Sequence, residues 1–344
     1  MKMFNKILLM ATISMVSLSA CCDDENATPQ TVPTYDMTGF AKGADISWIT
    51  EMENSGVKFY DAAGREKECM ALLREMGVNS IRLRVWVNPT NGWNNKNDVV
   101  AKAWRAKNLG MRIMIDFHYS DSWADPSQQT IPAAWKNYDL TQMKKAVADH
   151  TTDVLQALKD KNIDVEWVQV GNETRTGMLW PMGSVSGNDF TNFAQLEASG
   201  YDAVKNVYPN AKVIVHIDQG DKLANFTWMF DGLKNNGGKW DVIGMSLYPE
   251  DATWKTQTTN CLSNIKTLIS RYNTQVIISE IGTAWDSEKA DSVMTGMVNG
   301  CKAINNCLGI FYWEPECYKQ WNGYTKGAFD NSGRPTSALD AFKE

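Results

Sequence analysis

Short apolar runs alternate with longer amphipathic stretches along the chain from residue 40 onward. The short runs are rich in β-branched and aromatic residues, which favours buried strands, and the longer stretches show the apolar period of a helix. Strands are expected at 41–46, 80–86, 112–118, 167–170, 212–217, 241–248, 275–280 and 308–314. Helices are expected at 66–76, 97–109, 140–159, 190–207, 222–235, 254–272, 286–304 and 337–342.

This alternation predicts an α/β fold in which each strand is followed by a helix. Strands that are apolar throughout are typical of a parallel sheet covered on both faces. Eight such units in one domain favour a (β/α)8 TIM barrel. A doubly wound open sheet is the alternative, and it is less favoured because no glycine-rich phosphate-binding turn follows the first strand.

The N-terminus has the features of a targeting segment. Lys2 and Lys6 precede a short apolar run at 7–16, which is too short for a comfortable membrane span. The residues that follow, Leu18-Ser19-Ala20-Cys21, resemble a bacterial lipobox. The resemblance implies that residues 1–20 are removed as a signal peptide and that Cys21 is lipidated. An ordinary secretory signal with an incidental cysteine is the alternative.

The residues after Cys21 extend this interpretation. The acidic run Asp23-Asp24-Glu25 resembles the surface-export signal of some Gram-negative lipoproteins, so we expect an outer-membrane protein that faces the cell exterior. Residues 21–39 are rich in threonine, proline and polar side chains and are expected to form a lipidated flexible tether. Residues 40–344 then form the single folded domain.

The amino-acid composition limits which kinds of partner the protein binds and which kinds of binding site it contains. An apolar content of 43% is enough for a sizeable core, and a net charge of -6 argues against nucleic acid as a partner. Fourteen tryptophans suggest flat aromatic surfaces in the core or against ligand rings. The five cysteines beyond the tether, Cys69, Cys261, Cys301, Cys307 and Cys317, lack zinc-type spacing. Cys301 is able to pair with Cys307 or Cys317, and isolated buried thiols are equally compatible with the sequence.

Polar and aromatic residues stand at the C-terminal end of every expected strand, where barrel enzymes place their chemistry. They are Asp45, Arg84, Trp86, His118, Asn172, Glu173, His216, Asp218, Tyr248, Glu280, Trp313 and Glu314. The two histidines end different strands and form no ligand cluster, so no catalytic metal is expected. Their expected task is to hydrogen-bond a ligand or a catalytic carboxylate.

Two carboxylates among these residues suggest a reaction. Glu173 ends the fourth strand and Glu280 the seventh, so both are expected at the barrel mouth. Paired carboxylates with abundant tryptophan and no metal ligands suit glycoside hydrolysis, in which one carboxyl group donates a proton and the other attacks or stabilises C1. Arg84 is expected to lower the pKa of the nucleophile, and Tyr248 is expected to orient it.

Several segments resemble the retaining barrel glycosidases and, more closely, the family 53 endo-β-1,4-galactanases. They are 43–47 (GADIS), 82–86 (RLRVW), 116–126 (DFHYSDSWADP), 169–173 (QVGNE), 244–249 (GMSLYP), 279–282 (SEIG) and 312–315 (YWEP). The segment at 116–126 is the most specific. The matches span nearly all of the expected folded domain.

The resemblance implies a role for each matching residue. Glu173 would be the acid/base, Glu280 the nucleophile, and Asn172 the partner of the 2-hydroxyl of the reacting sugar. The residues expected around that sugar are Arg84, His118, His216, Tyr248 and Trp313, and Asp45 is expected to bind substrate as well. The groove would be lined by Trp86, Trp123 and Asp125, and Asp218 would bond a sugar further along.

The expected substrate is β-1,4-galactan of pectic type I arabinogalactan, cleaved by a monomeric enzyme that requires no cofactor. Some bacterial members carry a calcium site between strands seven and eight, but residues 281–306 hold only Asp286, Glu288 and Asp291 as scattered acids. No calcium site is therefore carried over. The alternatives are an endo-glycanase of the same clan acting on mannan, xylan or cellulose, or a non-catalytic glycan-binding surface lipoprotein.

Overall fold

A computed structural model describes residues 38–343 of the chain. Eight parallel strands close into a barrel in the order β1-β12-β11-β10-β9-β6-β5-β4. Their bounds are β1 Ala41–Asp45, β4 Ser80–Val85, β5 Arg112–Phe117, β6 Trp167–Val170, β9 Lys212–Ile217, β10 Val242–Leu247, β11 Gln275–Ile281 and β12 Cys307–Trp313. The predicted TIM barrel and its eight strands are therefore confirmed.

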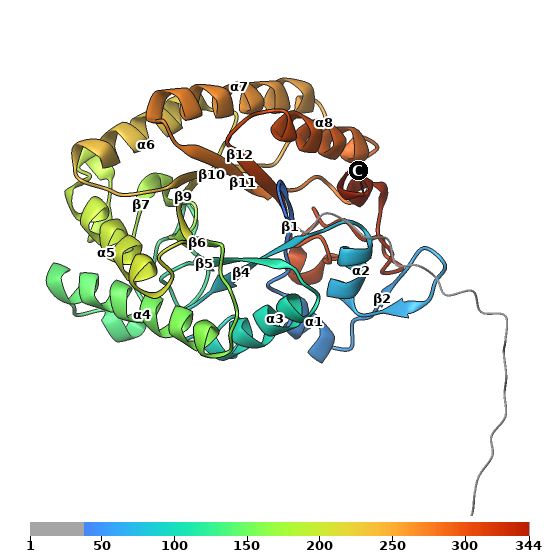
Figure 1. The fold of residues 1–344 in the computed structure, drawn as a ribbon, viewed down its shortest axis with the longest axis horizontal. Helices are drawn as coiled ribbons and strands as arrows, with labels where there is room; N and C mark the ends of the chain where they lie inside the picture. The colour runs from blue at the N-terminus through green and yellow to red at the C-terminus, as the bar shows by residue number, and fades with distance from the viewer. Residues whose placement is uncertain (1–37, 344) are drawn as a thin grey trace, which may run out of the picture. The chain divides into compact units, whose positions relative to one another are not determined.

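Helices lie around the outside of the strands, and the blue β1 lies beside the orange-red β12 where the barrel closes (Figure 1). The helices are α1 Ile49–Asn54, α2 Cys69–Glu75, α3 Lys96–Asn108, α4 Leu140–Asp160, α5 Thr191–Val207, α6 Leu223–Asn235, α7 Trp254–Tyr272 and α8 Ala290–Lys302. The predicted terminal helix is the 3-10 helix Ser337–Phe342.

Differences from the expected elements are confined to the connections. Short α1 was not predicted, nor were the hairpins β2–β3 (Phe59–Tyr60, Glu66–Lys67) and β7–β8 (Gly177–Met178, Gly183–Ser184). The helix expected from residue 66 begins three residues later, because Glu66 and Lys67 pair in the first hairpin and Glu68 caps the helix by accepting from the Ala71 amide. These segments are too short to give a periodic signal.

Two apolar layers hold the barrel together. One fills its interior with Ala41, Met114, Trp167, Ile214, Val242, Ile277 and Phe311, and the other lies between the strands and the surrounding helices. The inner layer is tight at β1, where a Cβ on Gly43 would lie 2.1 Å from the Phe311 ring. A packed interior at this level leaves only the mouth of the barrel for a site.

The structure bears on the expected N-terminal segment, on membrane-spanning helices and on the cysteines to different extents. The signal peptide, Cys21 and most of the tether lie outside the described residues. Within residues 38–343, no helix is long and apolar enough to span a membrane. All five cysteines of the folded domain are buried free thiols, so neither pairing of Cys301 forms in this structure.

Candidate active site

The chain turns sharply where β6 ends, and this turn presents the first carboxyl group. Gly171 has φ 84°, and Glu173 adopts φ 45° and ψ 50° in the left-handed region. A non-glycine residue in that region costs on the order of 1 kcal/mol, which surrounding structure must offset. Glu314, at the end of β12, is left-handed as well, with φ 46°. The backbone is thus held in strained turns at two strand ends of the mouth.

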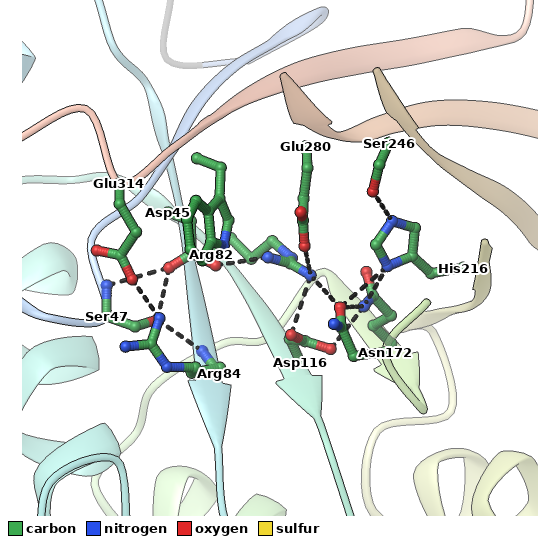
Figure 2. Close-up of polar contacts among 12 residues, drawn as sticks. Asp45, Ser47, Arg82, Arg84, Asp116, Asn172, His216, Ser246, Glu280 and Glu314 are labelled. Carbon is green, nitrogen blue, oxygen red and sulfur yellow. Dashed lines mark hydrogen bonds and ion pairs between the residues drawn. The ribbon is translucent and has the colours of Figure 1, made fainter. Parts of the chain in front are cut away.

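Arg82 occupies the centre of the mouth and is fully buried. Its Nη1 lies 2.6 Å from Asp45 Oδ2, and its Nη2 lies 2.9 Å from Asp116 Oδ2 (Figure 2). Nη2 is also 2.9 Å from Glu280 Oε1 and 3.0 Å from Asn172 Oδ1. One guanidinium therefore connects residues from four other strands or their ends, including the two at which chemistry is expected.

Glu280 is held as a hydrogen-bond acceptor. Besides Arg82, the Tyr248 hydroxyl donates to its Oε2 at 2.7 Å. Burial raises the pKa of Glu280 above its usual value, while Arg82 and the Tyr248 hydrogen bond oppose that rise. Both of these partners donate hydrogen bonds to the Glu280 carboxyl group, which favours its ionised form. The predicted contact of Tyr248 with Glu280 is present.

Glu173 has a less favourable environment for a negative charge. Burial and the nearby charge of Glu280 raise the pKa of Glu173 well above its usual value, and a hydrogen bond from the Ser246 hydroxyl opposes the rise only in part. Because Arg82 bonds Glu280 directly, the first proton to leave this coupled pair comes from Glu280. In the pH range in which Glu280 is ionised and Glu173 is not, the pair offers one acid and one carboxylate.

Both glutamates open into one pocket of about 320 Å³. It is lined by His118, Trp123, Ala124, Asp125, Asn172, Glu173, Tyr248, Glu280, Trp313, Tyr324 and Lys326. Eight of the residues singled out from the sequence are among them. The Asn172 amide nitrogen donates one hydrogen to the Ala124 carbonyl at 2.8 Å, which leaves its second hydrogen available to a ligand.

A second cavity of about 520 Å³ shares three aromatic walls with this pocket. Trp123, Trp313 and Tyr324 border both, and Trp48 and Trp86 line the second alone. Successive rings meet edge to face at centroid distances of 4.7 to 6.0 Å. The two cavities together form a groove with an aromatic half and a carboxylate half.

Arg84 supports the aromatic half from behind. Its guanidinium forms an ion pair with Glu314 and lies over the rings of Trp48, Trp86 and Trp123 at 5.0, 5.3 and 4.3 Å. Glu314 Oε2 in turn accepts from the Trp48 backbone amide at 3.1 Å. The buried pair thereby fixes the positions of the rings that border the groove.

Three expected ligand contacts are corrected by this arrangement. Arg84, Asp45 and His216 are at most 1% exposed and line neither cavity. Arg82, rather than Arg84, meets Glu280 and opposes the rise of its pKa. Both arginines point inward from β4, and Arg84 is taken up by Glu314. Asp45 pairs with Arg82, and His216 lies behind the pocket wall.

The remaining expected residues, Trp86, Asp125 and Asp218, occupy three different positions. Trp86 lines the second cavity, whereas Asp218 is outside both and forms a two-point ion pair with Arg175, with Nε to Oδ1 at 2.6 Å. Asp125 lines the catalytic pocket and accepts from the Ser127 amide at 2.7 Å. Their expected contacts with a ligand stay predictions.

Comparison with known proteins shows the family to which the chain belongs. Glycosyl hydrolase family 53 matches residues 41–300, about three quarters of the chain. The chain belongs to glycosyl hydrolase family 53. It is 33% identical to a probable arabinogalactan endo-β-1,4-galactanase A of Neosartorya fischeri, over 80% of this chain and 83% of that protein.

A bacterial relative and a solved structure agree with this membership. The chain is 32% identical to the endo-β-1,4-galactanase of Bacillus subtilis, over 80% of this chain and 70% of that one. It superposes on a fungal β-1,4-galactanase structure with a TM-score of 0.82 at 29% identity, covering 89% of this chain and 99% of the other. The predicted family and its glycoside hydrolase class are thus confirmed.

The acids of the connection after β11 do not gather into a calcium site. Among the described residues, Glu314, Glu316 and Cys317 are the one group of three potential ligands whose donor atoms lie close together. That group excludes Asp286, Glu288 and Asp291. Glu314 is already engaged by Arg84 and the Trp48 amide. The expectation that this connection holds no calcium site stays a prediction.

Sequence reasoning missed several residues of the site. Arg82 stands in a quoted motif, but alternation along a strand gives its face and not its depth. Asp116 and Ser246 are also in quoted motifs and were passed over because neither ends its strand. Tyr324 and Lys326 line the pocket from the irregular segment after β12, where the sequence carries no periodic signal.

Proposed function

We propose that the chain is an arabinogalactan endo-β-1,4-galactanase that cleaves internal β-1,4-galactosidic bonds with retention of configuration. The observation that carries the proposal is the pairing of Glu173 and Glu280 in one pocket with opposite hydrogen-bond environments. Membership of family 53 and the galactanase names of its relatives support the substrate.

In the first step the Glu280 carboxylate attacks C1 while Glu173 gives its proton to the leaving oxygen. The C1–oxygen bond breaks and a galactosyl–Glu280 ester forms. In the second step Glu173 takes a proton from water, whose oxygen attacks C1 and releases Glu280. Retention of this kind requires carboxyl groups about 5–5.5 Å apart. These two groups carry the chemistry, so we propose no cofactor.

The other residues of the groove bind the polymer. We assign the second amide hydrogen of Asn172 to the 2-hydroxyl of the reacting sugar, and the faces of Trp313, Trp123 and Trp86 to neighbouring sugar rings. A groove longer than one sugar suits cleavage within a chain. His118 and Asp125 complete the pocket wall as candidate hydroxyl partners.

A panel of linear galactan, mannan, xylan and cellulose tests the substrate and the reaction together. We expect reducing ends from galactan, with a rapid fall in polymer length that marks endo action. Glu173→Ala and Glu280→Ala proteins serve as controls, and azide should restore turnover with an inverted product only in the second. Binding without turnover by the wild type would favour the glycan-binding alternative, and cleavage of another glycan would overturn galactan as substrate.

We also propose that the protein is an exported lipoprotein, anchored through Cys21 in the outer membrane and facing the cell exterior. The lipobox resemblance and the acidic run after Cys21 support this location, which suits a polymer too large to cross a membrane. Labelling with a palmitate analogue tests the anchor, because a Cys21→Ser variant should take up no label. We propose a monomer, which light scattering of the folded domain tests.

A further inference from the structure

The peptide bond between Asn172 and Glu173 sets the direction in which the Glu173 side chain leaves the backbone. Glu173 is in the left-handed region, with φ 45° and ψ 50°, so its intrinsic backbone preference does not hold it there. The carbonyl oxygen of this peptide accepts from Gln129 Nε2 at 2.9 Å. Its N–H points at His216 Nδ1 at 3.4 Å, and the His216 ring lies beside Asn172 (Figure 2). Both ends of the peptide thus have a side-chain partner.

The orientation of the Gln129 side-chain amide is fixed by its partners. Gln129 Nε2 lies 2.9 Å from the Asn172 carbonyl oxygen and 3.2 Å from the Asp125 carbonyl oxygen. Because backbone carbonyls only accept hydrogen bonds, the NH2 group of Gln129 must face both of them. The side chain is 2% exposed. Gln129 is therefore a buried double donor between the loop after β5 and the end of β6.

The loop that carries Gln129 is joined to the region around Glu173 at two further points. The Asn172 side-chain amide donates to the Ala124 carbonyl at 2.8 Å. The Trp180 backbone N–H, from the segment that follows Glu173, donates to the Gln129 carbonyl at 2.7 Å. The loop thus contacts the chain on both sides of Glu173. Gln129 lines neither cavity of the groove, so it would act on a bound sugar through the residues that it holds.

We propose that Gln129 is a positioning residue for Glu173. By holding the Asn172 carbonyl, it directs the Glu173 carboxyl group toward the leaving oxygen in the first step and toward the attacking water in the second. The inference rests on the proposed function, because it takes Glu173 as the acid/base. Without this donor the left-handed turn is free to relax, and a displacement of about 1 Å in a reacting group is enough to cost roughly 100-fold in rate.

The test replaces Gln129 by methionine, which keeps the length of the side chain and removes both donated hydrogen bonds. We expect kcat on linear galactan to fall roughly tenfold or more, because both steps need Glu173. An aryl galactobioside with a dinitrophenolate leaving group needs no proton in its first step. Gln129→Met should therefore form the glycosyl–Glu280 ester from it at close to the wild-type rate, seen as a pre-steady-state burst, and hydrolyse that ester slowly.

Azide distinguishes a misplaced acid/base from general damage. The azide ion attacks C1 of the glycosyl–Glu280 ester, the bond between C1 and the Glu280 oxygen breaks, and a β-galactobiosyl azide with retained configuration leaves without proton transfer. Azide should therefore raise kcat on the aryl substrate several-fold for Gln129→Met, as for Glu173→Ala, and should not do so for wild type. An equal loss on both substrates that azide does not relieve would overturn the proposal.

Gln128→Met is the matched control. Gln128 is the exposed neighbour, and its Nε2 donates to Asp125 Oδ2 at 2.8 Å, so the variant disturbs Asp125 alone. We expect wild-type kcat and no response to azide. Gln129→Leu, an apolar variant of different shape, provides a second test if methionine impairs folding. Labelling of Glu280 with an aryl 2-deoxy-2-fluoro-galactobioside counts the folded molecules, so that every rate is expressed per intact site.

Failure of the proposed function has a different signature. If azide does not accelerate Glu173→Ala on the aryl substrate, the acid/base role of Glu173 fails and the inference falls with it. If Glu173→Ala responds to azide and Gln129→Met does not, only the role of Gln129 is refuted. If the wild type cleaves another glycan of the panel, the aryl glycoside of that glycan replaces the galactobioside and the same comparison decides.

Discussion

Arg82 and Arg84 are two residues apart on the same strand, point into the same barrel mouth and serve different halves of the groove. Arg82 contacts three carboxylates and an amide through its N–H groups. Arg84 makes one ion pair, with Glu314, and spreads its planar face beneath three tryptophan rings. Both are fully buried.

The difference follows from the shape of a guanidinium, which has a polar edge and a weakly hydrated face. Where acids surround it, the edge is used and the group organises charge for a reaction. Where one acid and several rings surround it, the face is used and the group organises a surface for sugars. One residue type thus builds both the reactive half and the binding half of a single groove.

The largest effect is expected from removing the charge of the Glu280 carboxylate, which is paired with Arg82. Glu280→Gln keeps the shape and should lower kcat roughly 10³-fold or more, since the proposed nucleophile is lost. Glu316→Gln is the control: burial and Glu314 raise the pKa of Glu316 well above its usual value, so its carboxyl group is neutral and resembles an amide. Comparable rate losses in the two variants would contradict the assignment of Glu280.

Exchanging each arginine for lysine separates the two halves. Arg82→Lys removes the fork that joins Glu280 to Asp116 and Asn172, so kcat should fall roughly 100-fold with a smaller change in KM. Arg84→Lys keeps the charge beside Glu314 but loses the planar stack, so KM should rise about tenfold. Steady-state kinetics on galactan measures both constants. The same pattern in both variants would refute the division.

A smaller effect is expected at the ring nearest Arg84. Trp123 borders both cavities, and Trp123→Ala should cost about 1 kcal/mol of substrate binding, seen mainly as a rise in KM of roughly fivefold. Trp104, which is 52% exposed on α3 and lines neither cavity, provides the control through Trp104→Ala. A loss confined to kcat would place Trp123 in the reactive half instead.

The smallest expected effect is a displacement of the pH profile. Activity should rise with pH as Glu280 ionises and fall at higher pH as Glu173 loses its proton, because the pKa of Glu173 is the more strongly raised. Tyr248→Phe removes a donor that lowers the pKa of Glu280, so its acid limb should move to higher pH. A shift to lower pH would show that the hydroxyl stabilises the protonated form.

The sequence was sufficient for the barrel and for the position of the two glutamates at its mouth, because both depend on local signals. Continuous apolar strands report a covered parallel sheet, and the residue after such a strand lies at its mouth. The depth of each side chain within the mouth could not be predicted from the sequence. Arg84 meets Glu314 from 230 positions further along the chain, and nothing near either residue announces that partner.

The same limit explains the other corrections. Asp45 and His216 end strands as expected, yet each is covered by a neighbour from another part of the chain, Arg82 for one and Ser246 for the other. Residue type and strand position predict which side chains gather. Which of these side chains face the substrate depends on how deeply each one is buried in the barrel mouth.

The pairing of β1 with β12 sets a condition on when the enzyme becomes competent during its synthesis. Trp48 follows the first strand and receives its partner Glu314 only from the end of the last. A ribosome has therefore released nearly the whole barrel before the aromatic half of the groove is able to assemble. Chains interrupted late in translation, before Glu314, would contain both Glu173 and Glu280 but would lack the aromatic half of the groove. Activity is therefore expected only after the last strand of the barrel has been synthesised.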